Sequence, residues 1–261
     1  MKNEDLKEKS RQSRINSLVS IYHAESGHPG GVLSSIDILT YLYEVEMKYS
    51  RKTVPEKGDD RFILSKGHAA PALYAVAAEA GIIKSSDLNS LRKIGSRMQG
   101  HPDRNSAPWV EASTGSLGQG FSYAIGEAKG FRMQKMTNRV YTLLGDGELQ
   151  EGEVWEGAMI AGHHALSNLC AIIDYNKMQS DDLNKNIITL EPLADKWNAF
   201  NWNQIEIDGH DYYQISSALT KAKDCKDKPT VIIAHTIKGK GVSYMEGIPA
   251  WHGSVQFNDD D

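Results

Sequence analysis

The chain has 261 residues, of which 40% are hydrophobic and 24% are charged, and its formal net charge is −5. This balance is typical of one or two globular domains with a substantial buried core, not of a disordered chain. The negative net charge argues against a nucleic-acid partner, and the lack of any apolar stretch of about 18 residues argues against a membrane span.

The first twenty residues are polar and mixed in charge, which is unlike a secretory signal peptide. The two cysteines, Cys170 and Cys225, have neither metal-site nor redox-motif spacing. Cys170 lies in the apolar run LCAII and is expected to be a buried thiol. We therefore expect a cytoplasmic protein without disulfides.

In chain order, apolar spacing first predicts a helix over residues 4–25, which the stopping cluster SGHPGG at 26–31 ends. Ser34 or Ser35 is expected to cap a second helix. A short strand over 62–65 and an alanine-rich helix over 69–80 follow. Residues 95–120 are rich in Gly, Ser and Pro and are expected to form a long irregular loop, which in compact domains is usually functional.

From residue 120 onward, predicted helices and strands alternate. The predicted elements are helix 120–137, strand 139–144, helix 149–164, strand 169–174, helix 192–199, strand 204–207, helix 212–223 and strand 229–234. This alternation predicts an α/β fold with a mostly parallel, doubly wound sheet and helices on both faces. Ligands of such sheets bind outside the carboxyl ends of the strands.

The stretch YTLLGDGELQEGEVWEG, residues 141–157, leaves an interior strand and presents Asp146 between two glycines. Asn176 follows the next strand, thirty residues later, which is the length of one strand–helix–strand unit. Because consecutive parallel strands are often neighbours, both side chains are expected at one sheet edge. Their oxygens suit Mg²⁺ or Ca²⁺, and the helix that follows Asp146 favours a bound phosphate. Asp146 could instead simply cap that helix.

The GDG turn and the Asn thirty residues later resemble the thiamine diphosphate motif, and the residues between them resemble transketolase in particular. Other blocks resemble this family in the same order. They are SGHPGG at 26–31, SKGHAAPALYA at 65–75, QGHPD at 99–103, STGSLGQG at 113–120, EPLADKW at 191–197 and TIKGKGVSYME…WHG at 236–253. The resemblance implies a thiamine-diphosphate-binding domain over residues 1–253, and the acidic tail, 254–261, is expected to be disordered.

The resemblance also implies the residues of the site. The metal would be held by Asp146, Asn176 and the backbone carbonyl of Met178. The cofactor would be contacted by His68, Gly115, Leu117, Gly147, Glu148, Asn176 and His252. The catalytic set would be His28 and His101, which face the sugar, together with His252 and Glu151, whose carboxylate would join a network across a subunit interface.

Some of these residues have a second interpretation. Glu148, like Glu153 and Glu156, could be an ordinary first-turn acid on a solvated face. Lys238 and Lys240 lie in a segment that could approach the diphosphate, but lysines in a glycine-rich loop are more often solvated. The loop after Asn176 departs from relatives at Ser180 and Asp182, where an apolar residue and a glycine are common, so the cofactor's thiazolium would meet a more polar wall.

The resemblance implies a transferase that moves a two-carbon ketol unit from a ketose, expected to be a sugar phosphate, to an aldose. In the family a glutamate from a second, pyrimidine-binding domain activates the cofactor, and the positions matching that domain lie downstream of residue 261. We therefore expect the amino-terminal subunit of a split enzyme, which a separate carboxyl-terminal subunit completes in a heterotetramer of two of each chain. The alternatives are a subunit of a deoxyxylulose-phosphate synthase-like or 2-oxoacid dehydrogenase-like enzyme, or a binding half without chemistry.

Overall fold

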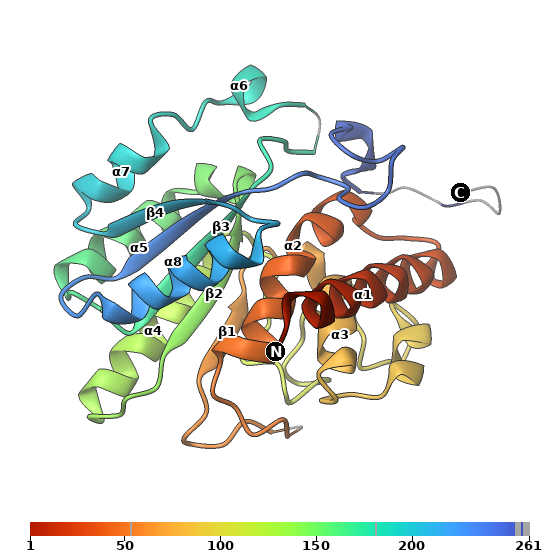
Figure 1. The fold of residues 1–261 in the computed structure, drawn as a ribbon, viewed down its shortest axis with the longest axis horizontal. Coiled ribbons are helices and arrows are strands. Elements are labelled where there is room, and N and C mark those ends of the chain that lie inside the picture. Colours follow the sequence, from red (N-terminus) through yellow and green to blue (C-terminus); the bar gives the residue numbers. More distant parts are fainter. Residues whose placement is uncertain (53, 181, 254–256, 258–261) are drawn as a thin grey trace.

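Five parallel strands form one sheet in the computed structural model, which describes residues 1–52, 54–180, 182–253 and 257 (Figure 1). The strands are β1 (Arg61–Leu64), β2 (Val140–Gly145), β3 (Leu169–Tyr175), β4 (Asn203–Asp208) and β5 (Thr230–His235), in the spatial order β1-β2-β3-β5-β4. The predicted parallel sheet is confirmed. Strands β2 and β3 pair directly, with Gly145 opposite Asp174, so their carboxyl ends meet at the same edge.

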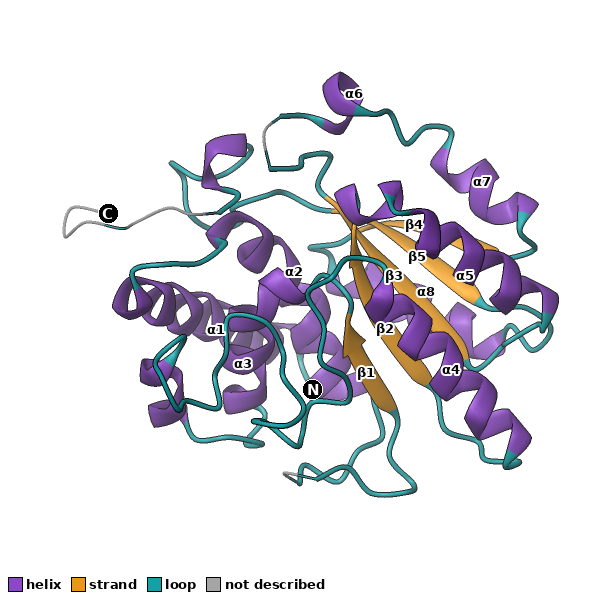
Figure 2. Ribbon diagram, turned by 180° about the vertical axis from the view of Figure 1, so that it is seen from behind, coloured by secondary structure: helices purple, strands orange, loops and turns teal. Residues whose placement is uncertain are grey.

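Helices cover both faces of the sheet, as a doubly wound fold requires (Figures 1 and 2). Helices α2 (Pro29–Tyr41) and α8 (Tyr212–Asp224) lie on one face, and α1 (Asn3–Ala24) and α3 (Ala70–Glu79) pack around α2. The other face carries α4 (Gln119–Met133), α5 (Gly152–His163) and α7 (Leu193–Ala199), and the short α6 (Asn184–Ile187) follows β3.

The two faces produce two buried clusters, because successive side chains of a strand point to opposite sides of the sheet. In β2, Tyr141 and Leu143 belong to the cluster under α2 and α8, whereas Val140 and Leu144 belong to the cluster under α4 and α5. Cys170 is fully buried in the first cluster, as predicted, and both cysteines are free. These interior strands therefore read as continuous apolar runs.

The start of α2 corrects one prediction. The helix begins at Pro29, with His28 as its cap residue, because proline is favoured at the first helical position. The expected caps, Ser34 and Ser35, are buried inside the helix, where their hydroxyls donate back to the carbonyl of Gly31 at 3.2 and 2.7 Å. The glycine-rich turn before α2 is thereby brought to the edge of the sheet.

The buried face of α1 also differs from its apolar pattern. Ile15, Val19 and Tyr22 are exposed, and the buried face consists mainly of small residues, Leu6, Ser10, Ser13, Ser17, Ser20 and Ile21. The hydroxyl of Ser17 donates to the carbonyl of Pro71, at 3.3 Å, in the first turn of alanine-rich α3. Small side chains on both helices permit this close approach.

The remaining predictions are mostly confirmed to within a few residues. No helix or strand is described between residues 91 and 118, as expected for the long loop. The helix predicted over 149–164 is divided into a 3-10 turn, Gly147–Gln150, and α5. The expected tail, 254–261, lies outside the described residues except for Phe257, whose ring stacks on Trp251.

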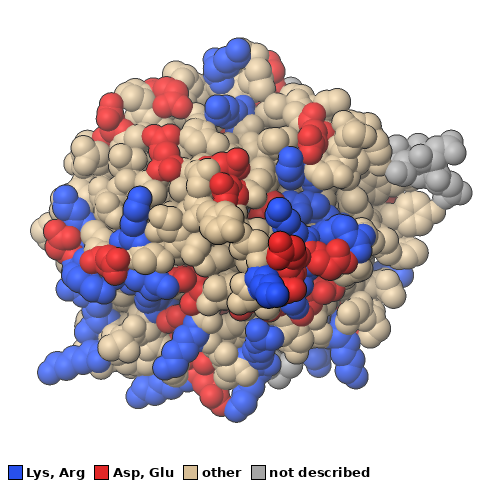
Figure 3. Space-filling model, in the orientation of Figure 1, with Lys and Arg blue, Asp and Glu red and all other residues tan. Residues whose placement is uncertain are grey.

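Charged groups are mixed over the surface. On the face shown in Figure 3, acidic and basic side chains are interspersed, and basic ones are more frequent towards the lower edge. Lys221 and Lys223 in the last turn of α8 suit the negative end of the helix dipole. None of the described helices is long and apolar enough to cross a membrane.

Candidate functional site

A cavity of about 210 Å³ lies at the carboxyl ends of β2 and β3. Ten of the twelve site residues predicted from the sequence line it, namely His28, His68, Gly115, Leu117, Asp146, Gly147, Glu148, Asn176, Met178 and His252. The lining also includes residues that sequence reasoning did not assign to the site, among them Lys66 and Gln179. The position agrees with the general rule for ligand sites in parallel sheets.

Asp146 and Asn176 meet at this edge, as predicted from the spacing of the strands. The Asp146 carboxylate is buried and accepts hydrogen bonds from the backbone N–H groups of Gly147, at 2.9 Å, and Lys177, at 2.5 Å. The Asn176 amide oxygen accepts from the N–H of Met178 at 3.1 Å. Asp146 thus caps the 3-10 turn and also faces the cavity, so the two interpretations of this residue are compatible.

The charge of Asp146 is poorly compensated within the chain. Burial and the neighbouring Asp174 carboxylate raise the pKa of Asp146 to about 7, against the opposing effect of the two backbone donors. A divalent cation at this carboxylate would offset both causes. The donor set here, a carboxylate with amide and carbonyl oxygens, is of the hard type that Mg²⁺ and Ca²⁺ prefer.

A buried ion pair supports the floor of the cavity. The Lys66 ammonium donates to Asp174, to Ser35 at 3.1 Å and to the Gly31 carbonyl at 2.9 Å. Burial opposes ionisation of Asp174, but Lys66 and the hydroxyls of Ser34 and Thr236 keep the pKa of this carboxyl below its ordinary value. Every charge of the pair is therefore hydrogen-bonded, as a buried pair requires.

Three histidines form one wall. The ring centroids of His28, His68 and His252 are 5.3, 5.5 and 5.8 Å apart. Burial is the main cause that lowers the pKa of His28 to about 4 and that of His252 to about 3, and it places the pKa of His68 well below the ordinary value. Nearby Arg92, Lys66 and Lys238 add to the effect. The three imidazoles are therefore neutral at pH 7.

His101 and Glu151 do not line the cavity. The exposed His101 lies beside it, because its ring packs on Gly115: a Cβ at Gly115, where φ is +143°, would lie 2.8 Å from the His101 Cδ2 atom. Glu151 is exposed and precedes α5, where its Cβ lies 3.5 Å from a Cβ built on Gly118. The predicted role of Glu151 at a subunit interface stays a prediction.

Glu148 is not a solvated acid, and that interpretation is wrong. Its side chain is 2% exposed and accepts hydrogen bonds from the Ser65 hydroxyl at 2.5 Å and from the N–H groups of Gly118 and Gly145 at 2.9 Å each. It therefore fastens the loop that carries Gly115 and Leu117 to the end of β2. Glu156 is exposed, as expected.

Lys238 corrects a second prediction of solvation. Its side chain is 1% exposed, and its ammonium donates to the carbonyl of Gln179 at 2.8 Å and lies 2.7 Å from Nδ1 of His252. Burial lowers the pKa of Lys238 to about 8, although Asp146 opposes this effect. Lys240, by contrast, is partly exposed and pairs with Glu246 at 3.4 Å.

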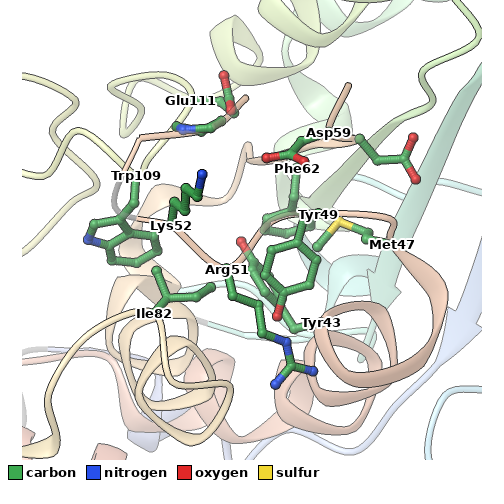
Figure 4. A pocket seen from close by; sticks show the side chains of 12 residues that line it. Tyr43, Met47, Tyr49, Arg51, Lys52, Asp59, Phe62, Ile82, Trp109 and Glu111 are labelled. Atoms are coloured by element: carbon green, nitrogen blue, oxygen red, sulfur yellow. The ribbon is translucent and has the colours of Figure 1, made fainter. Parts of the chain in front are cut away.

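A second, smaller pocket lies near the amino end of β1 (Figure 4). Its volume is about 40 Å³, and its lining includes Tyr43, Tyr49, Trp109 and Glu111. The Tyr43 ring packs edge-on against Tyr49 and Phe62, so the aromatic side chains fill much of the space. This pocket is much smaller than the first cavity, and none of the predicted site residues lines it.

Comparison with known proteins agrees with the geometry. Residues 7–261 match the family described as the thiamine diphosphate binding domain of transketolase. The chain is 43% identical to the 6-deoxy-6-sulfo-D-fructose transketolase subunit SqwG of Clostridium sp. (strain MSTE9) over 248 residues, which are 95% of this chain and 90% of the relative. It is 38% identical to one of the subunits of the apulose-4-phosphate transketolase of Phocaeicola vulgatus, over 98% of this chain and 90% of the relative.

Longer relatives match over part of their length. Human transketolase is 41% identical over 249 residues, which are 95% of this chain but 39% of the human protein. The crystal structure of transketolase from Campylobacter jejuni superposes with a TM-score of 0.90 at 32% identity, over 97% of this chain and 41% of that one. The doubly wound fold described above is thus shared with a solved structure.

Proposed function

The chain belongs to the transketolase family as its thiamine diphosphate binding domain, and we propose that it is the amino-terminal subunit of a split transketolase. Two relatives that it covers almost completely are themselves named as subunits, which supports a partner chain. In this proposal the partner supplies the pyrimidine-binding domain, and two of each chain form a heterotetramer. The observation that carries the proposal is the single cavity that ten of the predicted site residues share.

The cavity suits a pyrophosphate ester with a divalent cation. The buried Nδ1 of His28 and Nε2 of Gln179 have no hydrogen-bond partner among the residues that the structure describes, and both side chains line the cavity. Buried polar atoms of this kind normally have a partner. Lys238 adds a cation beside these groups, which favours an anionic ligand. The residues present therefore fit thiamine diphosphate.

Each residue then has a distinct task. Asp146, Asn176 and the Met178 carbonyl would hold Mg²⁺ or Ca²⁺, and His68, His252, Gly147 and Lys238 would bind the diphosphate. Gly115 and Leu117 would contact the rest of the cofactor. Bound thiamine diphosphate supplies an electron sink that allows the carbon–carbon bond next to a ketose carbonyl to break and form again. We assign these roles to residues 1–253 as one domain, and the cytoplasmic location expected from the sequence stays a prediction.

The neutral histidines suit proton transfer at the sugar. A neutral imidazole can donate a hydrogen bond to a substrate oxygen from its N–H group and accept one from a hydroxyl at its other nitrogen. We propose this role for His28 and His101, with His252 between the sugar and the diphosphate.

The substrate class follows from the family and from the named relatives. Ketol transfer moves two carbons from a ketose to an aldose, and the relatives are named for a sulfonated fructose and for apulose 4-phosphate. We propose a ketose donor that carries an anionic group, with a phosphate as the first choice. The partner subunit would bind much of the distal end of the sugar.

Reconstitution tests the proposal. The chain alone is expected to show no ketol transfer, and the chain co-purified with its partner is expected to convert a ketose phosphate and an aldose when thiamine diphosphate and Mg²⁺ are present. Full turnover by the isolated chain would refute the split enzyme. Asp146→Ala is expected to abolish Mg²⁺-dependent cofactor binding in calorimetry, and the exposed Glu156→Ala is the control. Equal affinity in the two variants would contradict the metal role of Asp146.

A further inference from the structure

The two histidines assigned to the sugar come from separate loops, and one side chain connects those loops. Arg92 donates from Nη1 to the hydroxyl of Ser26 at 2.5 Å, two residues before His28. Its guanidinium also lies flat against Gly100, the residue before His101. A Cβ on Gly100 would be 2.7 Å from the Arg92 Nε atom, 3.1 Å from Cζ and 3.2 Å from Nη2.

The backbone of Arg92 is set for this position. Its φ is +59°, a left-handed backbone conformation that residues other than glycine rarely adopt. Its N–H donates to the carbonyl of Met98 at 2.8 Å. The sequence does not reveal this conformation, because position 92 is not a glycine.

The guanidinium also acts through its charge. Among the described residues, its buried Nε has no hydrogen-bond partner and no carboxylate forms an ion pair with Arg92. Its positive charge therefore acts on the neighbouring imidazoles. After burial, Arg92 is the next cause that lowers the pKa of His28 to about 4, and it is also the next cause for the lowered pKa of His101. Arginine does not lose its proton at any ordinary pH, so this effect is permanent.

We propose that Arg92 is a positioning residue that ties the His28 and His101 loops together and places its positive charge beside both imidazoles. The importance of this for catalysis rests on the proposed function, in which the two histidines serve as neutral proton carriers at the sugar. The tie and the charge are separate contributions. The first depends on the planar shape of the guanidinium, and the second requires only a cation.

Other groups also face these histidines and stay in place when Arg92 is changed. His28 is flanked by the rings of His68 and His252 and is influenced by Lys66, Lys238 and His101. His101 packs on Gly115, and Arg92 is the charged group that acts on it. A change at position 92 therefore leaves these other groups in the chain, and the comparison of Arg92→Gln with Arg92→Lys separates the charge from the tie.

Imidazole titration by NMR in the 261-residue chain tests the charge contribution. Resonances are assigned by their loss in His28→Gln and His101→Gln variants. In Arg92→Gln, the pKa of His28 is expected to rise by about half a pH unit or more, as removal of one partly screened charge predicts, and the pKa of His101 is expected to rise as well. Arg97→Gln removes an exposed arginine from the same segment and should change neither value. Unchanged values in Arg92→Gln, or an equal rise in Arg97→Gln, would overturn this part.

Arg92→Lys separates the tie from the charge. The lysine keeps the cation but cannot both bond Ser26 and lie flat on Gly100, so the two pKa values should stay low while amide hydrogen exchange over residues 26–31 and 98–102 becomes faster. Exchange as slow as in the wild type would overturn the tie. Neither measurement needs cofactor, partner or turnover, so failure of this inference and failure of the proposed function are distinguishable.

Discussion

Replacement of Glu148 by alanine tests whether its buried carboxylate fastens the loop that carries Gly115 and Leu117 to the end of β2. The change removes the acceptor of two buried backbone N–H groups, those of Gly118 and Gly145, and of the Ser65 hydroxyl. An orphaned buried donor costs about 1–3 kcal/mol. Two effects reduce this loss of stability. The Ser65 hydroxyl can turn to a new partner, and burial raises the pKa of Glu148, which means that the buried charge itself destabilises the fold and that its removal is favourable. We expect the free energy of unfolding to fall by about 2–4 kcal/mol.

Urea unfolding at pH 7, with linear extrapolation to water, measures this loss. Glu148→Gln keeps one oxygen for the partners of Oε1, Ser65 and Gly118, but sets an NH₂ group against the N–H of Gly145. The free energy of unfolding of Glu148→Gln should therefore fall by about half as much as that of Glu148→Ala. The exposed Glu156→Ala should change stability by no more than about 0.5 kcal/mol. If Glu148→Ala loses no more than this control, the fastening role is wrong.

Three other predictions concern pH, charge and space. Burial raises the pKa of Glu111 from 4.5 to about 7, so its stabilisation is fully present below pH 4.5 and is lost as pH rises through 7. The wild-type minus Glu111→Gln difference in unfolding free energy should fall by about 3 kcal/mol over that window, and a flat difference would contradict the raised pKa. Lys238→Met should weaken Mg²⁺-dependent thiamine diphosphate binding in calorimetry by about tenfold or more, because a charged hydrogen bond is lost. The control Lys240→Met should change this affinity by less than about twofold. Equal effects of the two variants would place Lys238 outside the site. Gly120→Ala puts a Cβ 2.6 Å from the Ser65 Cα, and Gly126→Ala in the same helix meets nothing within 4 Å. We expect Gly120→Ala to lower the free energy of unfolding by about 2 kcal/mol and Gly126→Ala to raise it by up to about 1 kcal/mol. Thermal melts in which Gly126→Ala is the less stable variant would refute the packing at position 120.

Much of the fold and the site was predictable because the decisive signals are local. Strands β1, β2, β3 and β5 are apolar runs closed by glycine or a polar residue, and one strand–helix–strand unit separates Asp146 from Asn176. A parallel crossover with this spacing brings both residues to one edge without information from the rest of the chain. The same argument could place a metal site but could not show what lies beneath it, such as the pair formed by Lys66 and Asp174.

The errors arise where contacts between distant segments decide burial. Lys238 lies in a glycine-rich segment and looks solvated from the sequence. The N–H of Gly239, however, donates to the carbonyl of Gly30 at 3.0 Å and so holds this segment against the start of α2. Glu148 follows a glycine turn like any first-turn acid, but two of its three donors, Ser65 and Gly118, come from distant parts of the chain. The serine face of α1 is buried because α3 opposite it is rich in alanine. None of these partners can be read from the local pattern.

The order in which the cavity is built has a consequence for biosynthesis. Lys238 and His252 lie beyond β5, so the ribosome makes them after all five strands of the sheet. A nascent chain synthesised up to His235 contains all five strands but still lacks Lys238 and His252, which we propose bind the diphosphate. Coenzyme binding would then be the last step of maturation. A folding intermediate that ends at His235 would contain the whole sheet but would not yet bind the coenzyme.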